Sequence, residues 1–297
     1  MRKRKNIILK ISIIILFLCL VTGYAAFGEN INLKAKGNIK EKSRIIKQYT
    51  ANSNEDFHTD FYKENITTIT FLDKIDVPKD AITSWDISSD SKGGVIAYIK
   101  ENSESKYDLF IASNGKVIAN SLSNNLFSRF KEVKEINFNG NFDTSKVTNM
   151  IYMFSYCTNL KNLDLSTFDT SNVYEMGGMF EGCYSLESVD LSSFNTKEVR
   201  TMWYMFTECH NLKTLNLNNF YTPNLYTVSA MFEGCSVLET LNLCNFDTSK
   251  ITAYERMFNG TSKIKEINVN SNWNLKSDDI FTGSSLQDVT AGKCIKE

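Results

Sequence analysis

Apolar residues recur along the chain from Phe142 to about Trp273 with a period of 26 residues. Each of five consecutive units opens on a phenylalanine, continues through a Met-Phe pair, and ends in an apolar-x-x-apolar-x-apolar string. The opening residues are Phe142, Phe168, Phe194, Phe220 and Phe246, and the pairs begin at Met153, Met179, Met205, Met231 and Met257. A fixed period of this size indicates units that bury their apolar faces only by stacking on their neighbours.

The pattern inside one unit predicts two kinds of element. The segment 163–165 alternates apolar, polar, apolar, which predicts a short strand. The segment 173–183 carries apolar residues every three or four positions, which predicts a turn or two of helix. Thr170 and Ser171, just before it, are good helix N-caps. We therefore expect an α/β repeat solenoid, a leucine-rich-repeat-like right-handed coil of about 26-residue units with a β-rich N-terminal cap.

The flanking sequence predicts how the chain is divided. Basic residues at the N-terminus precede an apolar run, which is typical of a secretory signal peptide, cut before Ala26, or of an uncleaved anchor. Upstream of the repeats, Asn114-Gly115 between two apolar runs predicts a β-hairpin. The expected segments are a signal peptide or N-terminal membrane anchor (1–27), a polar stalk (28–55), a β-rich N-terminal capping module (56–125), the repeat array (126–273) and a degenerate C-terminal cap (274–297).

Composition and motifs argue against several classes of function. A net charge of −1 gives no basic surface of the kind that nucleic acids require. Only two histidines are present, and no Ser or Cys recurs with either at a defined spacing, so no catalytic triad is indicated. Gly177-Gly178 lacks the Lys-Ser/Thr that follows in a phosphate-binding loop. We expect a protein that is not an enzyme, with no cofactor and no metal.

Four cysteines occupy the same position in successive units: Cys157, Cys183, Cys209 and Cys235. The fifth unit has Thr261 there. The position closes an apolar face, and cysteine is a common small buried residue, so we expect free buried thiols. Disulfides between neighbouring units and a metal site are the alternatives. Cys244 and Cys294 stand outside this row, and the sequence assigns them no role.

The polar position in the middle of each predicted strand forms a second row, which is the candidate partner-binding face: Asn137, Asp164, Asp190, Asn216, Asn242 and Asn268. A solvated polar face that hydrogen-bonds along the stack is the alternative. A third row alternates in sign, so that successive units can pair through it: Lys161, Glu187, Lys213, Glu239 and Lys265. Each exposed pair contributes only about 0–1 kcal/mol, which favours support of the register over binding.

Aromatic side chains also occur at positions that vary between units, namely Tyr152, Tyr174, Trp203, Tyr204, Tyr221 and Tyr226. On a rigid scaffold such residues can form a patch for a partner. Scattered surface aromatics are the alternative interpretation.

The string from Phe168 to Cys183, followed by Ser185-Leu186 and by Val189 to Ser192, resembles the repeat of the BspA-type leucine-rich-repeat surface proteins of bacteria. This resemblance covers the repeat block and part of the segment before it. It implies a cell-surface or secreted protein and, because some members are adhesins, a role in adhesion. The resemblance brings no catalytic residue.

These observations together predict an exported, non-catalytic binding or adhesion module on the bacterial cell surface or secreted from the cell. Its expected partner is a protein or glycan of a host or neighbouring cell, and it contacts the membrane through the N-terminal segment if that is uncleaved. A structural envelope spacer without a specific ligand is the first alternative. A hydrolase that uses carboxylates of the Asp164 row is the second.

Overall fold

The architecture comes from a computed structural model that describes residues 42–48, 63–276, 279–286, 289–291 and 294. The signal peptide or anchor predicted for residues 1–27 and most of the stalk predicted for 28–55 lie outside this part of the chain.

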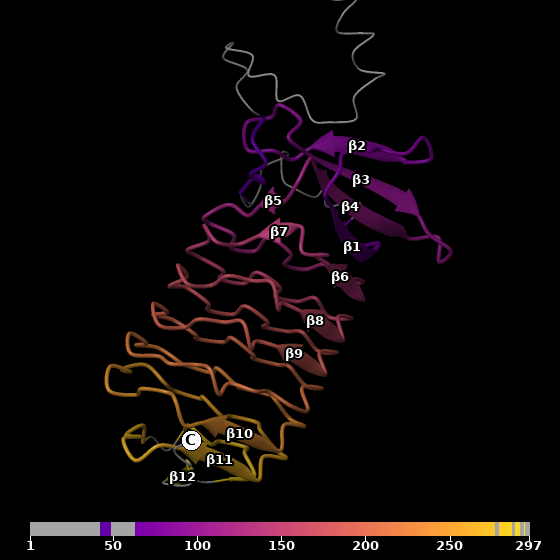
Figure 1. Ribbon diagram of the computed structural model, residues 1–297. Helices are drawn as coiled ribbons and strands as arrows, with labels where there is room; N and C mark the ends of the chain where they lie inside the picture. Colours follow the sequence, from indigo (N-terminus) through magenta and orange to yellow (C-terminus); the bar gives the residue numbers. More distant parts are fainter. Residues whose placement is uncertain (1–41, 49–62, 277–278, 287–288, 292–293, 295–297) are drawn as a thin grey trace, which may run out of the picture. The chain divides into compact units, whose positions relative to one another are not determined.

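In the described residues between Ile66 and Ala291, every secondary-structure element is a β-strand (Figure 1). The strands are β1 (Ile66–Leu72), β2 (Thr83–Asp86), β3 (Val95–Glu101), β4 (Tyr107–Ser113), β5 (Val117–Ile118), β6 (Glu135–Asn137), β7 (Phe142–Asp143), β8 (Asn162–Asp164), β9 (Ser188–Asp190), β10 (Thr240–Leu243), β11 (Glu266–Val269) and β12 (Thr290–Ala291).

The largest sheet contains five strands in the order β2-β3-β4-β1-β6. Strand β3 is antiparallel to both β2 and β4, whereas β1 is parallel to both β4 and β6. In β1, Ile69 lies opposite Ile136 of β6. The sequence already suggests this pairing, because both segments carry the same apolar-x-x-apolar-x-apolar string. The N-terminal sheet thus joins the repeats through backbone hydrogen bonds.

The hairpin predicted at Asn114-Gly115 is wrong. Strand β5 does not return antiparallel along β4 but pairs in parallel with β7, with Val117 opposite Phe142. Gly115 has a φ of 98° and donates its N–H to the carbonyl of Asp73 at 2.8 Å. The turn therefore directs the chain away from β4 toward the first repeat unit.

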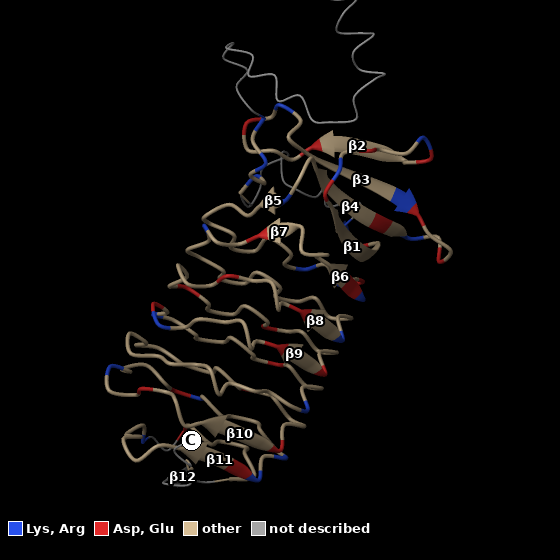
Figure 2. Cartoon of the chain, viewed as in Figure 1, with Lys and Arg blue, Asp and Glu red and all other residues tan. Residues whose placement is uncertain are grey.

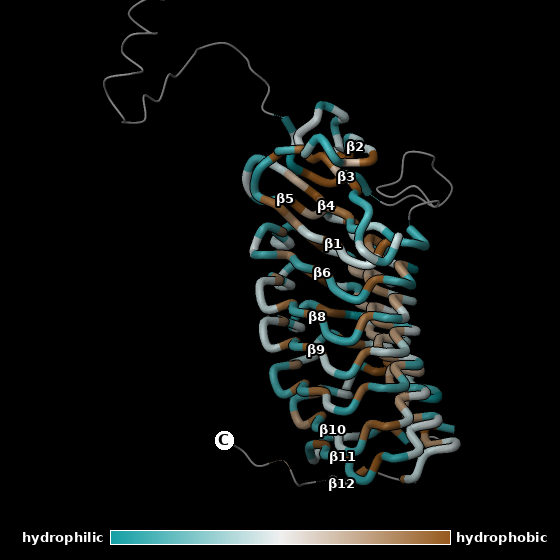
Figure 3. The backbone as a smooth tube through the Cα atoms, turned by 90° about the vertical axis from the view of Figure 1, so that its right-hand side faces the viewer, coloured by the Kyte–Doolittle hydropathy of each residue, from teal (hydrophilic) through white to brown (hydrophobic). Residues whose placement is uncertain are grey.

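The 26-residue spacing reappears in the structure as pairing between equivalent positions. One series of isolated parallel bridges joins Asn149, Glu175, Thr201, Thr227 and Ala253 in sequence. Figures 1 and 3 show β6, β8, β9, β10 and β11 following one another in this order. Each unit is therefore held to the next by its backbone.

The core is a set of side-chain rows that run from unit to unit. Phe154, Phe180, Phe206, Phe232 and Phe258 stack face to face, with ring centroids 5.4–5.8 Å apart. The methionines that precede them are fully buried. Figure 3 shows the same alternation of hydrophobic and hydrophilic segments recurring from unit to unit. Each aromatic contact adds about 0.5–1.5 kcal/mol beyond the buried area.

The predicted α/β solenoid of leucine-rich-repeat type is wrong, because no residue between 64 and 276 is helical. The strands also form four separate sheets of five, three, two and two strands rather than one continuous sheet. At residues 214–216, which are equivalent to β8 and β9 of the two preceding units, the expected strand does not form. The described part of the chain is all-β.

The reason lies in where the backbone N–H groups of segment 173–183 are directed. Met179, Glu181 and Cys183 each donate to the carbonyl three residues earlier, which closes tight turns. Their neighbours Gly178 and Phe180 donate instead to carbonyls of the following unit, at 2.7 and 2.9 Å. A helix needs all these donors for its own i−4 carbonyls. Successive tight turns and a helix produce the same three- and four-residue apolar spacing, so the pattern did not distinguish them.

Thr170 is likewise not a helix N-cap. Its side chain is buried, and its Oγ1 donates to the carbonyl of Asn195 at 3.0 Å while accepting the Asn195 N–H at 2.8 Å. The hydroxyl therefore joins two units rather than ending a helix.

Candidate functional site

Four residues of the predicted partner-binding row form local turns at the ends of the strand positions. Asp164, Asp190, Asn216 and Asn242 are exposed, and each side-chain Oδ1 accepts the N–H two residues further on, at 2.9–3.0 Å. Asp and Asn favour such turns because the side chain mimics the backbone carbonyl of an ordinary turn. The row thus has a structural role that the sequence pattern did not reveal.

These hydrogen bonds also set the charge of the row. The Ser166 N–H holds the pKa of Asp164 below its ordinary value, and the Ser192 N–H does the same for Asp190. Both carboxylates are therefore ionised at neutral pH, because a hydrogen bond to the charged form favours it.

At its two ends the row differs from its middle. Asn268 lies in β11 opposite Thr290 of β12, and its buried Oδ1 has no hydrogen-bond partner among the described residues. At the other end, Asn137 and Asp164 line one surface cavity of about 310 Å³. The structure therefore brings Asn137 and Asp164, two of the six predicted residues, together around this cavity.

The cavity lies where neighbouring strands do not pair. Among the described strands, β6 pairs with β1 and β8 pairs with β9, but β6 and β8 share no ladder. The connection from the strand to the next opening phenylalanine is also one residue longer here. Phe142 lies four residues after Phe138, whereas Phe168 lies three residues after Leu165. Asn139 and Gly140 take up the additional length with φ values of 50° and 68°. The remaining lining residues are Ile136, Phe138, Asn139, Gly140 and Thr167.

The cavity lining is predominantly polar. Asn137, Asn139, Asp164 and Thr167 supply amide, carboxylate and hydroxyl groups, while Ile136 and Phe138 are themselves buried. The Asn139 Nδ2 donates to the carbonyl of Phe71 at 3.3 Å, which holds this side chain against β1. The set can both donate and accept hydrogen bonds.

Two pairs of the alternating row form between neighbouring units in the described part of the chain. Lys213 contacts Glu187, and Lys265 contacts Glu239, each at 2.6 Å. Figure 2 shows acidic and basic positions interspersed along the series of strands from β6 to β11. All four side chains are largely exposed, so each pair contributes little to stability. This row supports the register.

The four cysteines in the row are buried free thiols, as expected. Each Sγ donates to a phenylalanine carbonyl of the preceding unit, for example Cys183 to Phe154 at 3.2 Å. Burial raises the pKa of Cys157 and of Cys235 to about 12, so these thiols are protonated at neutral pH. In the described part of the chain, no cluster of three or more His, Cys, Asp or Glu residues has metal-binding geometry.

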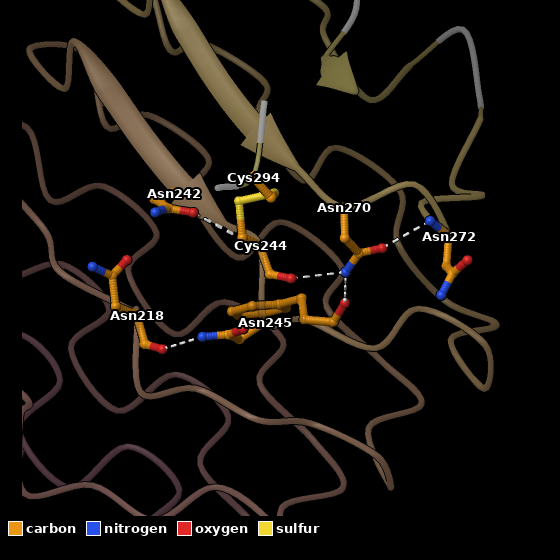
Figure 4. The surroundings of a disulfide bond; sticks show 8 residues. Asn218, Asn242, Cys244, Asn245, Asn270, Asn272 and Cys294 are labelled. Atoms are coloured by element: carbon orange, nitrogen blue, oxygen red, sulfur yellow. Dashed lines mark hydrogen bonds between the residues drawn. A yellow bond between two sulfur atoms is a disulfide. The ribbon is translucent and has the colours of Figure 1, made fainter. Parts of the chain in front are cut away.

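Cys244 and Cys294 form a disulfide, with Cα atoms 5.6 Å apart (Figure 4). Around it, Asn242 Oδ1 accepts the Cys244 N–H, and Asn270 Nδ2 donates to the Cys244 carbonyl at 2.9 Å. The bond ties the end of the chain to the residue that follows β10. Sequence reasoning missed it. The available signal was that exactly these two cysteines remain once the row and the N-terminal apolar segment are set aside.

In the described part of the chain, the fold and this set of side chains define an all-β repeat protein with a polar surface cavity and a disulfide between Cys244 and Cys294. The chain belongs to the family described as "Mycoplasma protein of unknown function, DUF285". The sequence model of this family matches residues 122–240 and 213–284, which together are more than half of the 297 residues. No curated protein and no solved structure matches the chain. Within the described ranges, no helix has the length and apolar character that a membrane crossing requires.

Proposed function

We propose that this protein is an exported, non-catalytic binding module that contacts a protein or glycan of a host or neighbouring cell through the cavity at Asn137 and Asp164. The cavity carries this proposal. Its volume of about 310 Å³ lies at the lower end of the range found for ligand pockets, roughly 300–1,000 Å³.

The chemistry of the lining favours a polar ligand group. Asp164 provides a negative charge that accepts hydrogen bonds, and the amides of Asn137 and Asn139 both donate and accept. Sugar hydroxyls and polypeptide amides offer the complementary donors and acceptors. No imidazole or thiol lines the cavity, which favours binding over group transfer.

Two features support export. The N-terminal basic residues and the apolar run after them are typical of a secretory signal or anchor. The Cys244–Cys294 disulfide is a bond that persists in oxidising compartments. The resemblance of the repeat string to BspA-type surface proteins agrees with this location.

Binding is tested by comparing Asp164→Ala with Asp190→Ala. The two aspartates make equivalent turns to Ser166 and Ser192, but only Asp164 lines the cavity. On panels of immobilised matrix proteins and glycans, we expect the purified protein to bind at least one component. Asp164→Ala should lose that binding, and Asp190→Ala should retain it. Equal loss in both variants, or no binding to either panel, would contradict the proposal.

Export is tested separately by sequencing the N-terminus of protein recovered from washed cells and from the medium. A start near Ala26 in the medium means secretion, and an intact N-terminus in the membrane fraction means a tethered protein. Recovery from the cytoplasm with Cys244 and Cys294 reduced would contradict export.

A further inference from the structure

Aromatic side chains gather around the glycines of the second repeat unit. Gly177 and Gly178 are buried, and a Cβ on either would collide with the ring of Trp203 or Tyr152 respectively. A Cβ on Gly182 would lie 2.6 Å from a ring carbon of Tyr156. Rings from the units before and after thus rest on the glycine backbone between them.

The rings also contact one another. Tyr152 meets Trp203 edge to face at a centroid distance of 5.3 Å, and Trp203 meets Tyr204 in the same way at 5.7 Å. Tyr184 stacks on His210 at 5.3 Å, and Tyr156 meets Tyr184 at 6.4 Å. Three of the six aromatic residues singled out in the sequence therefore lie together. Tyr184 and Tyr204 remain more than a third exposed, which leaves ring surface accessible.

Several of these residues adopt a backbone conformation that disfavours them. Tyr152, Tyr156 and Tyr204 have φ values of 55–57°, in the left-handed region. The second unit has Gly178 and Gly182 at the positions of Tyr152 and Tyr156. Glycine is the residue that this conformation prefers. Arg129, Ala230 and Arg256 share this conformation, so the turn accepts side chains of several kinds, and at positions 152, 156 and 204 the side chain is a tyrosine.

Two carboxylates lie among the rings. Tyr156 Oη donates to Glu181 Oε1 at 3.1 Å. Partial burial raises the pKa of Glu181, and the negative charge of Glu208 raises it further. Burial raises the pKa of Tyr184, and the carboxylate of Glu208 raises it further. Among the described residues, no ion pair joins either carboxylate to a cation, whereas the next acidic residue along, Glu233, is paired with Arg256.

We propose that this aromatic patch, formed by Tyr152, Tyr156, Glu181, Tyr184, Trp203, Tyr204 and Glu208, binds an arginine-containing segment of a partner protein. The patch offers negative charge without a counter-ion next to exposed aromatic faces. A guanidinium matches both features, because it stacks on aromatic rings and donates paired hydrogen bonds to carboxylates. A lysine ammonium forms the ion pair but stacks less well. A trimethylammonium group contacts the rings but donates no hydrogen bond to the carboxylates.

The test measures binding of a fluorescent peptide of repeated Arg-Gly pairs to the purified full chain by anisotropy. We expect saturable binding that weakens with salt and that is several-fold weaker for the matching Lys-Gly peptide. The double variant Glu181→Gln with Glu208→Gln should weaken it by roughly tenfold, as expected for the loss of charge-assisted hydrogen bonds. The glutamine at 181 still accepts the hydrogen bond of Tyr156.

Tyr204→Gly separates binding from folding. Glycine fits the φ of 55° at this position, as Gly178 shows in the preceding unit, so the fold is retained. We expect several-fold weaker peptide binding with an unchanged circular dichroism spectrum. Ala230→Gly makes the corresponding change one unit further on, outside the patch, and should bind like the unmodified chain. Asp164→Ala should also leave peptide binding unchanged, which separates this inference from the function proposed for the cavity.

Three results would overturn the inference. The first is no binding of the arginine peptide. The second is equal affinity of the unmodified chain, Tyr204→Gly and the double glutamine variant. The third is tighter binding to phosphatidylcholine vesicles than to the peptide, which would assign the patch to a membrane surface.

Discussion

Replacing one buried threonine should weaken the junction between two repeat units. The hydroxyl of Thr170 bonds both the N–H and the carbonyl of Asn195 in the next unit. The same position holds buried threonines throughout the array: Thr144, Thr170, Thr196, Thr222 and Thr248. Thr170→Val keeps the shape of the side chain but removes both hydrogen bonds.

The loss is estimated from those two bonds. Each contributes about 0.5–1.5 kcal/mol, and leaving a buried backbone group unpaired costs about 1–3 kcal/mol. We therefore expect Thr170→Val to lower the free energy of unfolding by about 2 kcal/mol, measured by urea denaturation followed by circular dichroism. Thr170→Ser keeps the hydroxyl and loses one methyl, so its loss should be nearer 1 kcal/mol.

The exposed Thr214 supplies the surface control, and Thr214→Val should change stability by less than about 0.5 kcal/mol. A loss of less than about 0.5 kcal/mol for Thr170→Val, or a serine variant as unstable as the valine variant, would refute the argument that the hydroxyl carries the junction. Because repeat arrays need not unfold in one step, the denaturation slope must be the same for all variants before the values are compared.

Three further predictions concern ionisation and redox state. At about pH 8 the four buried cysteines should resist a thiol reagent in the folded protein, because burial raises their pKa. They should react fully in urea, as counted by mass spectrometry. Rapid labelling of these four cysteines in the folded protein would contradict their burial. Cys294→Ser should lower the free energy of unfolding by about 2–4 kcal/mol, since the disulfide closes a 50-residue loop, and reductant should then have no additional effect on stability. Burial raises the pKa of Glu181, so its stabilising contribution is complete below the ordinary carboxyl pKa and is lost as pH rises through the raised value. The urea midpoint of the unmodified chain should therefore fall more between about pH 4 and pH 8 than that of Glu181→Gln, and parallel profiles would exclude this contribution.

The hydrophobic pattern predicted which side chains are buried but not the local backbone. Met179 and Phe180 are fully buried, as their repetition implies. Their three- and four-residue spacing is shared by a helix and by consecutive tight turns, and only the pairing partners of the backbone N–H groups decide between them. Those partners lie in the next unit, beyond the range of a local pattern.

The candidate site was predicted only in part for a similar reason. The row through Asp164 and Asp190 is visible in the sequence. The two aspartates form equivalent turns, however, so the sequence pattern does not show which of them lines the cavity. What distinguishes Asp164 is the unpaired boundary between β6 and β8 and the additional residue near Asn139. The disulfide was missed because Cys244 and Cys294 are 50 residues apart and only the return of the chain through β12 brings them together.

The two proposed binding regions and the disulfide share one property, which is that each lies where a unit departs from the repeat. The cavity coincides with an inserted residue, the aromatic patch with the Gly177-Gly178 pair, and the disulfide with a cysteine in a position that is Ser or Asn in other units. A regular unit satisfies its backbone and fills its core through its neighbours, so a substitution that interrupts this regularity usually costs stability. Binding is therefore to be sought first where a unit departs from the repeat and forms a cavity, an exposed aromatic surface or a covalent link. Tyr204→Gly, which introduces the residue that the preceding unit has at this position, is the most direct way to separate binding from folding in this protein.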